Sequence, residues 1–226
     1  MRLGVLFSGG KDSAFACWKA MQKEEVVCLI TIVSRNPESY MFHTPNIRFA
    51  ALQARSAGLP LLEMETEGEE ETELLDLRHA LLSARERFGI EGVVTGAILS
   101  VYQATRLQRV CYELGLWCFN PLWLADQEGY MEELLDAGFR VVITGVFASP
   151  FDESWLGREI DRRTLDELRA VARKDRITLT GEGGEFETFV IDAPFFSRRI
   201  VIEEGSRVYR NHNGVLRIER ARLVGR

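Results

Sequence analysis

Apolar runs of strand length alternate with longer segments of helical spacing over the first two thirds of the chain. The run at 3–7 is followed by apolar positions at helical spacing and then by the continuous apolar run 26–33. A strand that is apolar on both faces is typical of the interior of a parallel sheet covered by helices. The pattern then predicts helices that include 50–57, 74–88 and 107–114, strands at 61–65 and 93–96, and a further apolar segment at 116–124. This alternation indicates an α/β fold with a doubly wound, mainly parallel sheet.

The alternation ends near residue 150. A helix is predicted at 127–137 and a strand at 140–147, and the sequence Ala148-Ser149-Pro150 then interrupts the pattern. Beyond it the sequence predicts a helix at 166–174, a glycine-rich turn, and short alternating strands that include 199–202 and 215–224. We therefore expect two domains, residues 1–149 with the doubly wound sheet and residues 150–226 as a smaller α+β domain.

The first apolar run passes directly into Ser8-Gly9-Gly10-Lys11-Asp12-Ser13. Glycines let backbone N–H groups approach an anion, and the helix that follows adds the positive end of its dipole. In a Walker A loop the lysine is followed at once by Ser or Thr, so this is a different loop. A plain glycine turn is the alternative, and it explains neither Lys11 nor the flanking hydroxyls. The sequence therefore predicts a phosphate-binding loop.

Ligands of doubly wound sheets lie beyond the carboxyl ends of the strands. We therefore expect the loop at 8–13, the segment after Val33 and the segment 95–103 to meet around one cleft. A second polar motif, Gly-Glu-Gly-Gly-Glu-Phe-Glu-Thr at 181–188, lies in the predicted C-terminal domain. Its three glutamates could orient an amine, bind Mg²⁺ together with phosphates, or accept a proton. An acidic surface turn is the alternative.

Composition and charge narrow the class of protein. The 226 residues are 46% hydrophobic and 27% charged, as in ordinary soluble domains. There is no apolar run of about 18 residues, the length of a membrane helix, so we expect a cytoplasmic protein with no membrane partner. Four cysteines without a Cys-x-x-Cys pair argue against a zinc or redox site. The net charge of -6 argues against a stable nucleic-acid partner, although arginines are frequent from residue 198 onward.

The loop at 8–13 matches the Ser-Gly-Gly-Lys-Asp-Ser signature of the PP-loop ATP pyrophosphatases at every position. Together with Glu-Gly-Gly-Glu-Phe-Glu at 182–187, it makes the chain resemble the diphthine-ammonia ligase (diphthamide synthetase) family over most of residues 1–197. Further matching stretches are Thr95-Gly96-Ala97, Ser100-x-Tyr102-Gln103-x-x-Arg106 and Pro121-Leu122-Trp123. The resemblance implies an adenine nucleotide alpha hydrolase-like fold. The implied reaction is amidation of diphthine on translation elongation factor 2 through an adenylated carboxylate, with ATP and ammonium consumed and AMP and pyrophosphate released.

The resemblance and the chemistry together suggest roles for individual residues. ATP and its leaving pyrophosphate are expected to contact Ser8, Gly9, Gly10, Lys11, Asp12, Ser13 and Gly96. Lys11 is expected to stabilise charge in the first step, and Asp12 either caps the helix or contacts Mg²⁺ through water. Glu185 is the first candidate for the carboxylate that takes a proton from ammonium. The substrate-side candidates are His43, Gln103, Arg106, Glu182 and Glu187.

Some of these residues also fit purely structural interpretations. His43 also fits a locally bonded loop histidine, and Gln103 and Arg106, which share one face of a helix, also fit a solvated surface. Two other functions remain open, namely adenylation of another acceptor, such as tRNA or a small molecule, and nucleotide binding without catalysis. A homodimer is compatible with a chain of this size, and no segment identifies the contact.

Overall fold

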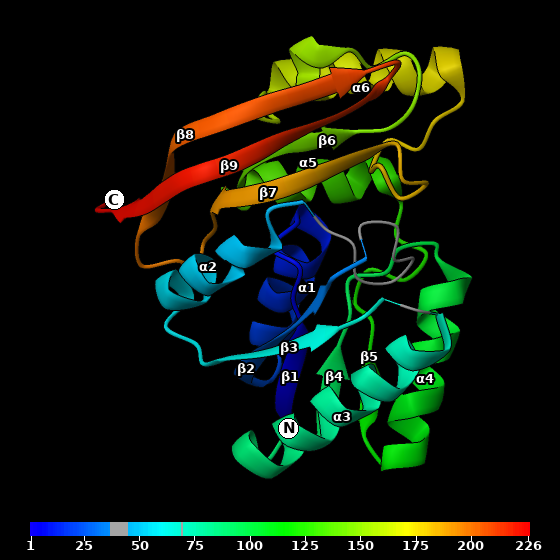
Figure 1. Ribbon diagram of the computed structural model, residues 1–226, viewed down its shortest axis with the longest axis vertical. Helices are drawn as coiled ribbons and strands as arrows, with labels where there is room; N and C mark the ends of the chain where they lie inside the picture. The colour runs from blue at the N-terminus through cyan, green and yellow to red at the C-terminus, as the bar shows by residue number, and fades with distance from the viewer. Residues whose placement is uncertain (37–44, 69) are drawn as a thin grey trace.

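The computed structural model describes residues 1–36, 45–68 and 70–226, and it contains two sheets joined through α1 and α5 (Figure 1). The first sheet has five strands in the order β3-β2-β1-β4-β5, and every neighbouring pair is parallel. Its strands are β1 (Arg2–Leu6), β2 (Glu25–Ser34), β3 (Leu61–Thr66), β4 (Gly92–Val94) and β5 (Trp117–Phe119). The chain builds outward from β1 on one side and returns to β4 on the other, so the strand order reverses between β1 and β4.

Helices cover both faces of this sheet, as the apolar pattern predicts. One face is packed by α1 (Lys11–Met21) and α2 (Ala50–Ala57), and the opposite face by α3 (Glu70–Phe88) and α4 (Val101–Leu114). The interior of β2, Cys28–Ile32, is buried, which explains why its sequence is apolar on both faces. The predicted doubly wound α/β fold is confirmed.

The second sheet is antiparallel and has the order β7-β6-β9-β8. It consists of β6 (Arg140–Val146), β7 (Phe186–Asp192), β8 (Arg199–Arg210) and β9 (Asn213–Val224), with α5 (Gln127–Asp136) and α6 (Arg162–Asp175) beside it. The strand β6 therefore lies in the second sheet, whereas the boundary expected near residue 149 groups it with the first. A parallel strand and a buried antiparallel strand of this length have similar apolar sequences. The sequence of β6 therefore does not reveal the sheet to which it belongs.

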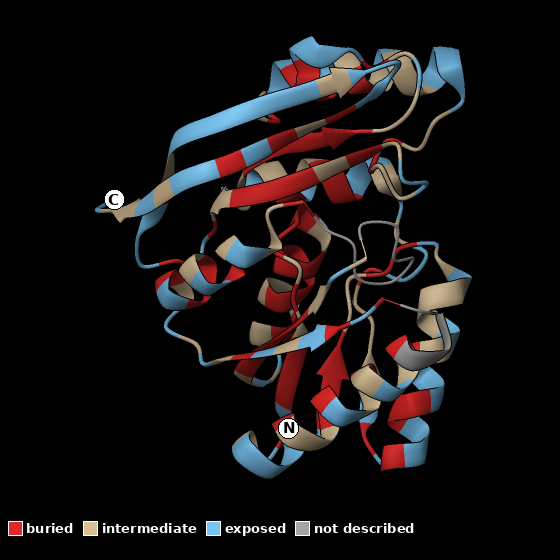
Figure 2. Cartoon of the chain, in the orientation of Figure 1, coloured by how far each residue is buried: buried red, intermediate tan, exposed pale blue. Residues whose placement is uncertain are grey.

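A single apolar core connects the two sheets. Phe15 of α1 packs against Tyr130 of α5 and against Phe139, which precedes β6. In Figure 2 the buried residues continue from α1 into β6 and β7. Because α1 begins at the phosphate loop, this core fixes the loop relative to the second sheet.

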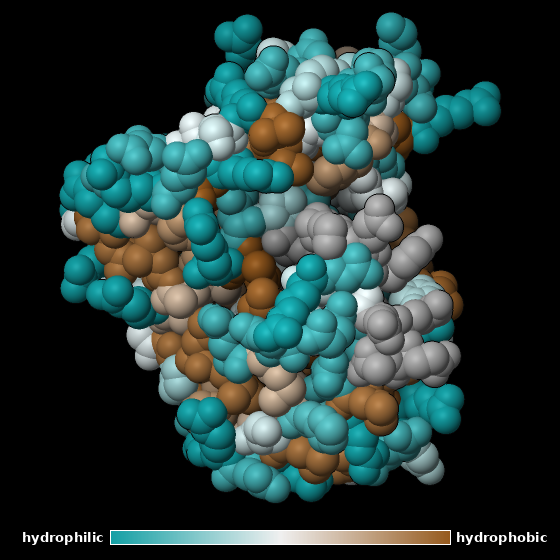
Figure 3. All heavy atoms as spheres, viewed as in Figure 1, coloured by the Kyte–Doolittle hydropathy of each residue, from teal (hydrophilic) through white to brown (hydrophobic). Residues whose placement is uncertain are grey.

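The β8–β9 hairpin carries most of the C-terminal arginines, and several of them are paired with acids. Arg220 forms ion pairs with Glu203 and Glu204, and Arg222 also pairs with Glu203. Hydrophilic atoms cover the upper left of Figure 3, where β8 begins and β9 ends. Solvated strands therefore account for much of this basic sequence. No helix in the described part of the chain combines the length and the apolar character needed to cross a membrane.

Candidate active site

One cavity of about 440 Å³ brings together the phosphate loop, the loop after β4 and the turn at 181–184. It lies at the carboxyl ends of β1 and β4, where the strand order reverses and where ligands of such sheets bind. Of the expected site residues, those that line it are Ser8, Lys11, Asp12, Ser13, Gly96, Gln103, Glu182 and Glu187. Of the three segments expected around one cleft, the loop at 8–13 and the segment 95–103 therefore meet there as predicted, whereas residues 37–44 of the segment after Val33 lie outside the described residues.

Hydroxyl groups hold the phosphate loop in its turn. Ser13 Oγ accepts a hydrogen bond from Ser8 N (3.2 Å) and donates to Gly10 O (3.1 Å), while Ser8 Oγ accepts from Gly10 N (3.4 Å). Gly9 has φ +81°, and a Cβ added there would lie 2.4 Å from Gln53 Oε1, so both conformation and space require glycine. The loop is thus preformed, with the N-terminus of α1 behind it.

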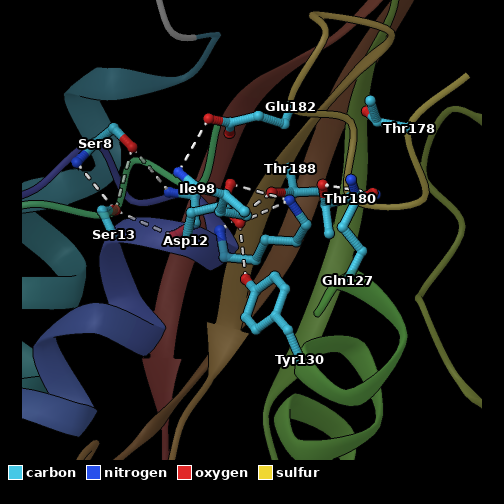
Figure 4. A network of polar contacts seen from close by, with 12 residues as sticks. Ser8, Asp12, Ser13, Ile98, Gln127, Tyr130, Thr178, Thr180, Glu182 and Thr188 are labelled. Atoms are coloured by element: carbon cyan, nitrogen blue, oxygen red, sulfur yellow. Dashed lines mark hydrogen bonds and ion pairs between the residues drawn. The ribbon is translucent and has the colours of Figure 1, made fainter. Parts of the chain in front are cut away.

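Lys11 is almost fully buried, with 2% of its surface exposed, and its ammonium group is paired inside the cavity. Nζ lies 2.9 Å from both carboxylate oxygens of Asp12. Tyr130 of α5 donates its hydroxyl hydrogen to Asp12 Oδ1 at 2.7 Å (Figure 4). Burial, together with the charge of Asp12, raises the pKa of Tyr130 well above its ordinary value, so the phenol stays protonated and remains a donor. The Lys11 ammonium group is therefore held in the cavity by Asp12, and an incoming anion can compete with Asp12 for it.

Of the two roles expected for Asp12, capping of α1 is wrong. The N-cap residue is Gly10, without a side-chain capping bond, and Asp12 lies within the first turn. Its carboxylate is directed to Lys11 and Tyr130 instead of to the backbone of the helix. Two glycines before the lysine leave the cap position without a side chain, and the free helix N–H groups are then available to an anion.

The back of the phosphate loop pairs with β7, which is an edge strand of the second sheet. Val190 N donates to Gly9 O (3.0 Å), and Lys11 N donates to Thr188 Oγ1 (3.1 Å). Gln53 of α2, which is fully buried, donates from Nε2 to Gly9 O (2.9 Å) and to Val190 O (2.8 Å). The loop thus satisfies a strand edge that would otherwise remain open. Sequence reasoning missed Gln53, Tyr130 and Thr188, and the only signal for Gln53 is a polar residue within a run of small apolar ones.

Gly96 is required by close packing against α1. A Cβ added at Gly96 would lie 2.7 Å from Asp12 C and 2.8 Å from Asp12 O and Ser13 N. The absence of a side chain lets the loop after β4 approach the first turn of α1 and close one wall of the cavity. Gly96 thus has a packing role in addition to its expected contact with ATP.

Glu182 links the acidic motif to the first sheet. Its Oε1 accepts three backbone hydrogen bonds, from Ile98 N (3.0 Å), Leu99 N (2.9 Å) and Ser100 N (3.0 Å), and Figure 4 shows it reaching toward Ile98. These N–H groups precede α4, where a negative charge is favourable. Glu182 therefore holds the 181–184 turn over the cavity.

Glu185, the first candidate for the proton acceptor, is not brought to the cavity. Its Oε1 accepts from Thr178 N and its Oε2 from Thr178 Oγ1, each at 2.7 Å, and it is absent from the cavity lining. A Cβ added at Gly183 would lie 2.6 Å from Glu185 Oε1, which shows that this carboxylate folds back over its own turn. Through these contacts Glu185 stabilises the shape of the turn.

Glu187 of β7 does line the cavity, together with Lys11 and Asp12. Desolvation raises the pKa of Glu187 to about 7, against the lowering effect of Lys11, and the charges of Asp12 and Glu182 add to the increase. At neutral pH this carboxyl group is divided between its two protonation states, as is common for acids and bases in catalysis.

The remaining expected residues differ in position. Gln103 lines the cavity in the first turn of α4, whereas Arg106 does not line it and instead stacks its guanidinium group 3.4 Å from the ring centre of Tyr102. Their expected common face toward the cleft therefore holds for Gln103 alone. His43 lies outside the described residues.

The described residues contain no group of three or more His, Cys, Asp or Glu side chains that could hold a metal ion. Mg²⁺ in nucleotide sites is commonly held by one or two carboxylates together with phosphate oxygens and water. Asp12 lines the cavity with 29% of its side chain exposed and fits the part of such a carboxylate. The donor set thus suits Mg²⁺ only when it arrives with a phosphate ligand.

Comparison with known proteins agrees with this geometry. The chain matches the model of the diphthamide synthase N-terminal domain over residues 1–118 and that of the diphthamide synthase C-terminal domain over residues 126–224. It belongs to the diphthamide synthase family. The match to the C-terminal domain begins before α5 and includes β6, which in the structure belongs to the second sheet.

Relatives within the diphthamide synthase family include proteins named diphthine–ammonia ligase. The Bos taurus protein is 31% identical, over 90% of this chain and 83% of its own length, and the Danio rerio protein is 32% identical, over 90% and 87%. The Saccharomyces cerevisiae protein is 30% identical over 87% of this chain and 33% of its own longer sequence. The prediction of an ATP-dependent ligase of this family is confirmed.

A solved structure titled a predicted subunit of tRNA methyltransferase from Methanocaldococcus jannaschii is also similar. It aligns with 85% of this chain and 97% of its own, at 16% identity and a TM-score of 0.44. A likeness this weak concerns the course of the backbone and says nothing of the reaction.

Proposed function

We propose that this protein amidates the diphthine side chain of translation elongation factor 2 in the cytoplasm, through an adenylated carboxylate. ATP and ammonium are consumed, and AMP and pyrophosphate are released. The observation that carries the proposal is the single cavity in which the preformed phosphate loop and the buried Lys11 meet Glu182 and Glu187 of the second motif. A phosphate-binding loop suits the adenylation half-reaction of an AMP-forming amide ligase, and an acidic site for an amine suits the amidation half-reaction. Both lie within one cavity.

The first half-reaction requires charge stabilisation and alignment more than a base, because the attacking carboxylate is already ionised at neutral pH. Backbone N–H groups at the start of α1 hold the outer phosphates, and Lys11 Nζ turns from Asp12 toward them. Tyr130 stays bonded to Asp12 and compensates it for the loss of the lysine. Asp12 is then free to hold Mg²⁺, which when bound neutralises phosphate charge.

The second half-reaction replaces AMP by ammonia at the acyl carbon. Phe7, Gly96 and Phe186 line this space, and we expect them to limit the access of water, which would otherwise hydrolyse the adenylate. Glu182 holds the acidic turn over this space through its three bonds to the loop after β4. The turn therefore helps to define where the amine can bind.

The test incubates the protein with ATP, MgCl₂, ammonium chloride and elongation factor 2 that carries diphthine. The expected results are AMP and pyrophosphate in equal amounts, and the mass decrease of the factor that replacement of a carboxylate oxygen by an amide nitrogen produces. Lys11→Met is the control, and it should lose both products. Release of ADP and phosphate would contradict the scheme. AMP formation with tRNA or with a small carboxylate, but not with the factor, would assign another acceptor.

A further inference from the structure

The three glutamates of the motif have different surroundings, although four residues separate the first from the last. The carboxylates of Glu182 and Glu185 are engaged, the former by three backbone N–H groups and the latter by Thr178. The carboxylate of Glu187 lines the cavity and receives no hydrogen bond from any side chain or backbone group in the described part of the chain. Of the two motif glutamates that line the cavity, Glu182 has Oε1 committed to backbone N–H groups, whereas both carboxylate oxygens of Glu187 remain available to a ligand.

The position of Glu187 in β7 is set by β6 on one side and by the phosphate loop on the other. It is opposite Gly145 of β6, and a Cβ added at Gly145 would lie only 3.0 Å from Glu187 Cβ. The next residue, Thr188, bonds to the backbone of Lys11, which ties this part of β7 to the phosphate loop. Because β7 is held on both sides here, Glu187 is fixed in the cavity wall that also contains Lys11 and Asp12.

We propose that Glu187 binds ammonium in the cavity and accepts a proton from it, so that neutral ammonia is formed beside the adenylated carboxylate. This role rests on the proposed function. In the step, one N–H bond of ammonium breaks and its proton passes to Glu187, and the nitrogen lone pair then forms a bond to the acyl carbon. The C–O bond to AMP breaks, AMP leaves with that electron pair, and the nitrogen loses a second proton to water as the amide forms.

The charges around Glu187 are suited to this task. Asp12 and Glu182 supply negative charge that attracts ammonium, and Lys11 is the described cation that opposes it. The movement of Lys11 toward the phosphates would lessen this opposition as the nucleotide reacts. Desolvation, which already raises the pKa of Glu187 to about 7, brings the acceptor closer to the basicity of ammonia than an ordinary glutamate.

The experiment compares Glu187→Gln with the matched control Glu219→Gln, the same change at an exposed residue of β9 outside the cavity. Adenylation is followed by exchange of labelled pyrophosphate into ATP in the presence of the diphthine-bearing factor and without ammonium. Amide formation is followed by the mass of the factor in a single turnover. Glu187→Gln should retain exchange within about threefold and lose amide formation by about 100-fold or more. Glu219→Gln should retain both.

Hydroxylamine separates proton transfer from a structural defect, because it is largely uncharged at pH 8 and needs no base to become a nucleophile. Glu187→Gln should form the hydroxamate at close to the wild-type rate. With ammonium, wild-type amidation should fall as pH drops below about 7. The residual rate of Glu187→Gln should instead rise about tenfold per pH unit with the fraction of free ammonia.

Failure of the inference and failure of the proposed function give different results. Wild-type exchange and amidation, accompanied by unchanged amidation in Glu187→Gln, would overturn the role of Glu187 alone. Loss of exchange in Glu187→Gln, or loss of hydroxamate together with amide, would also overturn it, because the defect would then lie outside proton removal. Wild-type protein that catalyses neither exchange nor amidation would overturn both proposals.

Discussion

Replacement of Gln53 by glutamate tests whether this buried amide holds the phosphate loop against β7. Gln53 Nε2 donates to Gly9 O and Val190 O, and Val190 itself is fully buried. A carboxylate in the same place would face two carbonyl oxygens and could donate to one of them only when protonated. We therefore expect Gln53→Glu to fold as the neutral acid, with a pH-dependent loss of stability.

The magnitude follows from the cost of keeping that acid protonated. Its folded-state pKa would be raised above the unfolded value of about 4.3. The penalty is therefore small below that value and grows by about 1.4 kcal/mol per pH unit as pH rises through it. Between pH 5 and pH 7 the loss relative to wild type should increase by about 2.5 kcal/mol. Gln53→Met leaves Val190 O without a donor, and its loss of about 2 kcal/mol should not depend on pH.

The assay is urea unfolding of wild type, Gln53→Glu and Gln53→Met at pH 5, 6 and 7, with ATP affinity measured by calorimetry at the same pH values. Gln22→Glu, at an exposed position after α1, controls for the added charge. Affinity for ATP should fall together with stability, because Gly9 loses one of its two supports. A Gln53→Glu protein whose stability relative to wild type is the same at pH 5 and pH 7 would refute the reasoning.

Three further substitutions test other parts of the site. Glu182→Ala should speed hydrogen exchange at the three amides it binds by about tenfold, while Glu182→Gln, which keeps a carbonyl acceptor, should do so less; equal protection in all three proteins would exclude the link. Tyr130→Phe removes the donor to Asp12 and should raise the KM for ATP several-fold with a stability loss of about 1 kcal/mol; an unchanged KM would contradict its supporting role. Gly96→Ala, which pushes a Cβ against the backbone of α1, should cost about 1–3 kcal/mol in a thermal melt and weaken ATP binding, and a wild-type melting curve would argue against the close packing.

The fold of the first sheet could be predicted because its signals are local. Apolar runs at strand length and apolar stripes at helical spacing specify each element, and short connections restrict how elements alternate. The placement of β6 was not accessible in this way. Its partners β7 and β9 lie 40 or more residues further along the chain, so its pairing depends on long-range contacts that a local pattern does not encode.

The residues of the candidate site could be predicted where they belong to continuous sequence motifs. The loop at 8–13 and the segment around Gly96 meet at the cavity as expected. The roles within the acidic motif were not predictable, because they depend on which way each side chain turns. Glu185 and Glu187 are equally acidic in sequence, and only the bend at Gly183 and the pairing of β7 separate one from the other. Gln53 gave only a weak signal, its place within a run of small apolar residues, because a glutamine in a helix is usually solvated.

The two motifs depend on one another through the register of β7. Thr188 accepts a hydrogen bond from the backbone of Lys11, and the backbone of Val190 donates to Gly9. Glu187 lies between the turn and these two contacts, and it lines the cavity. A shift of β7 by one residue would exchange the faces of Glu187 and Thr188 and would bring a carboxylate against the backbone of the phosphate loop. Phosphate binding would then be lost together with the cavity-facing acid. The spacing within the acidic motif is therefore constrained by the phosphate loop, which explains how two segments so far apart in the sequence form one site.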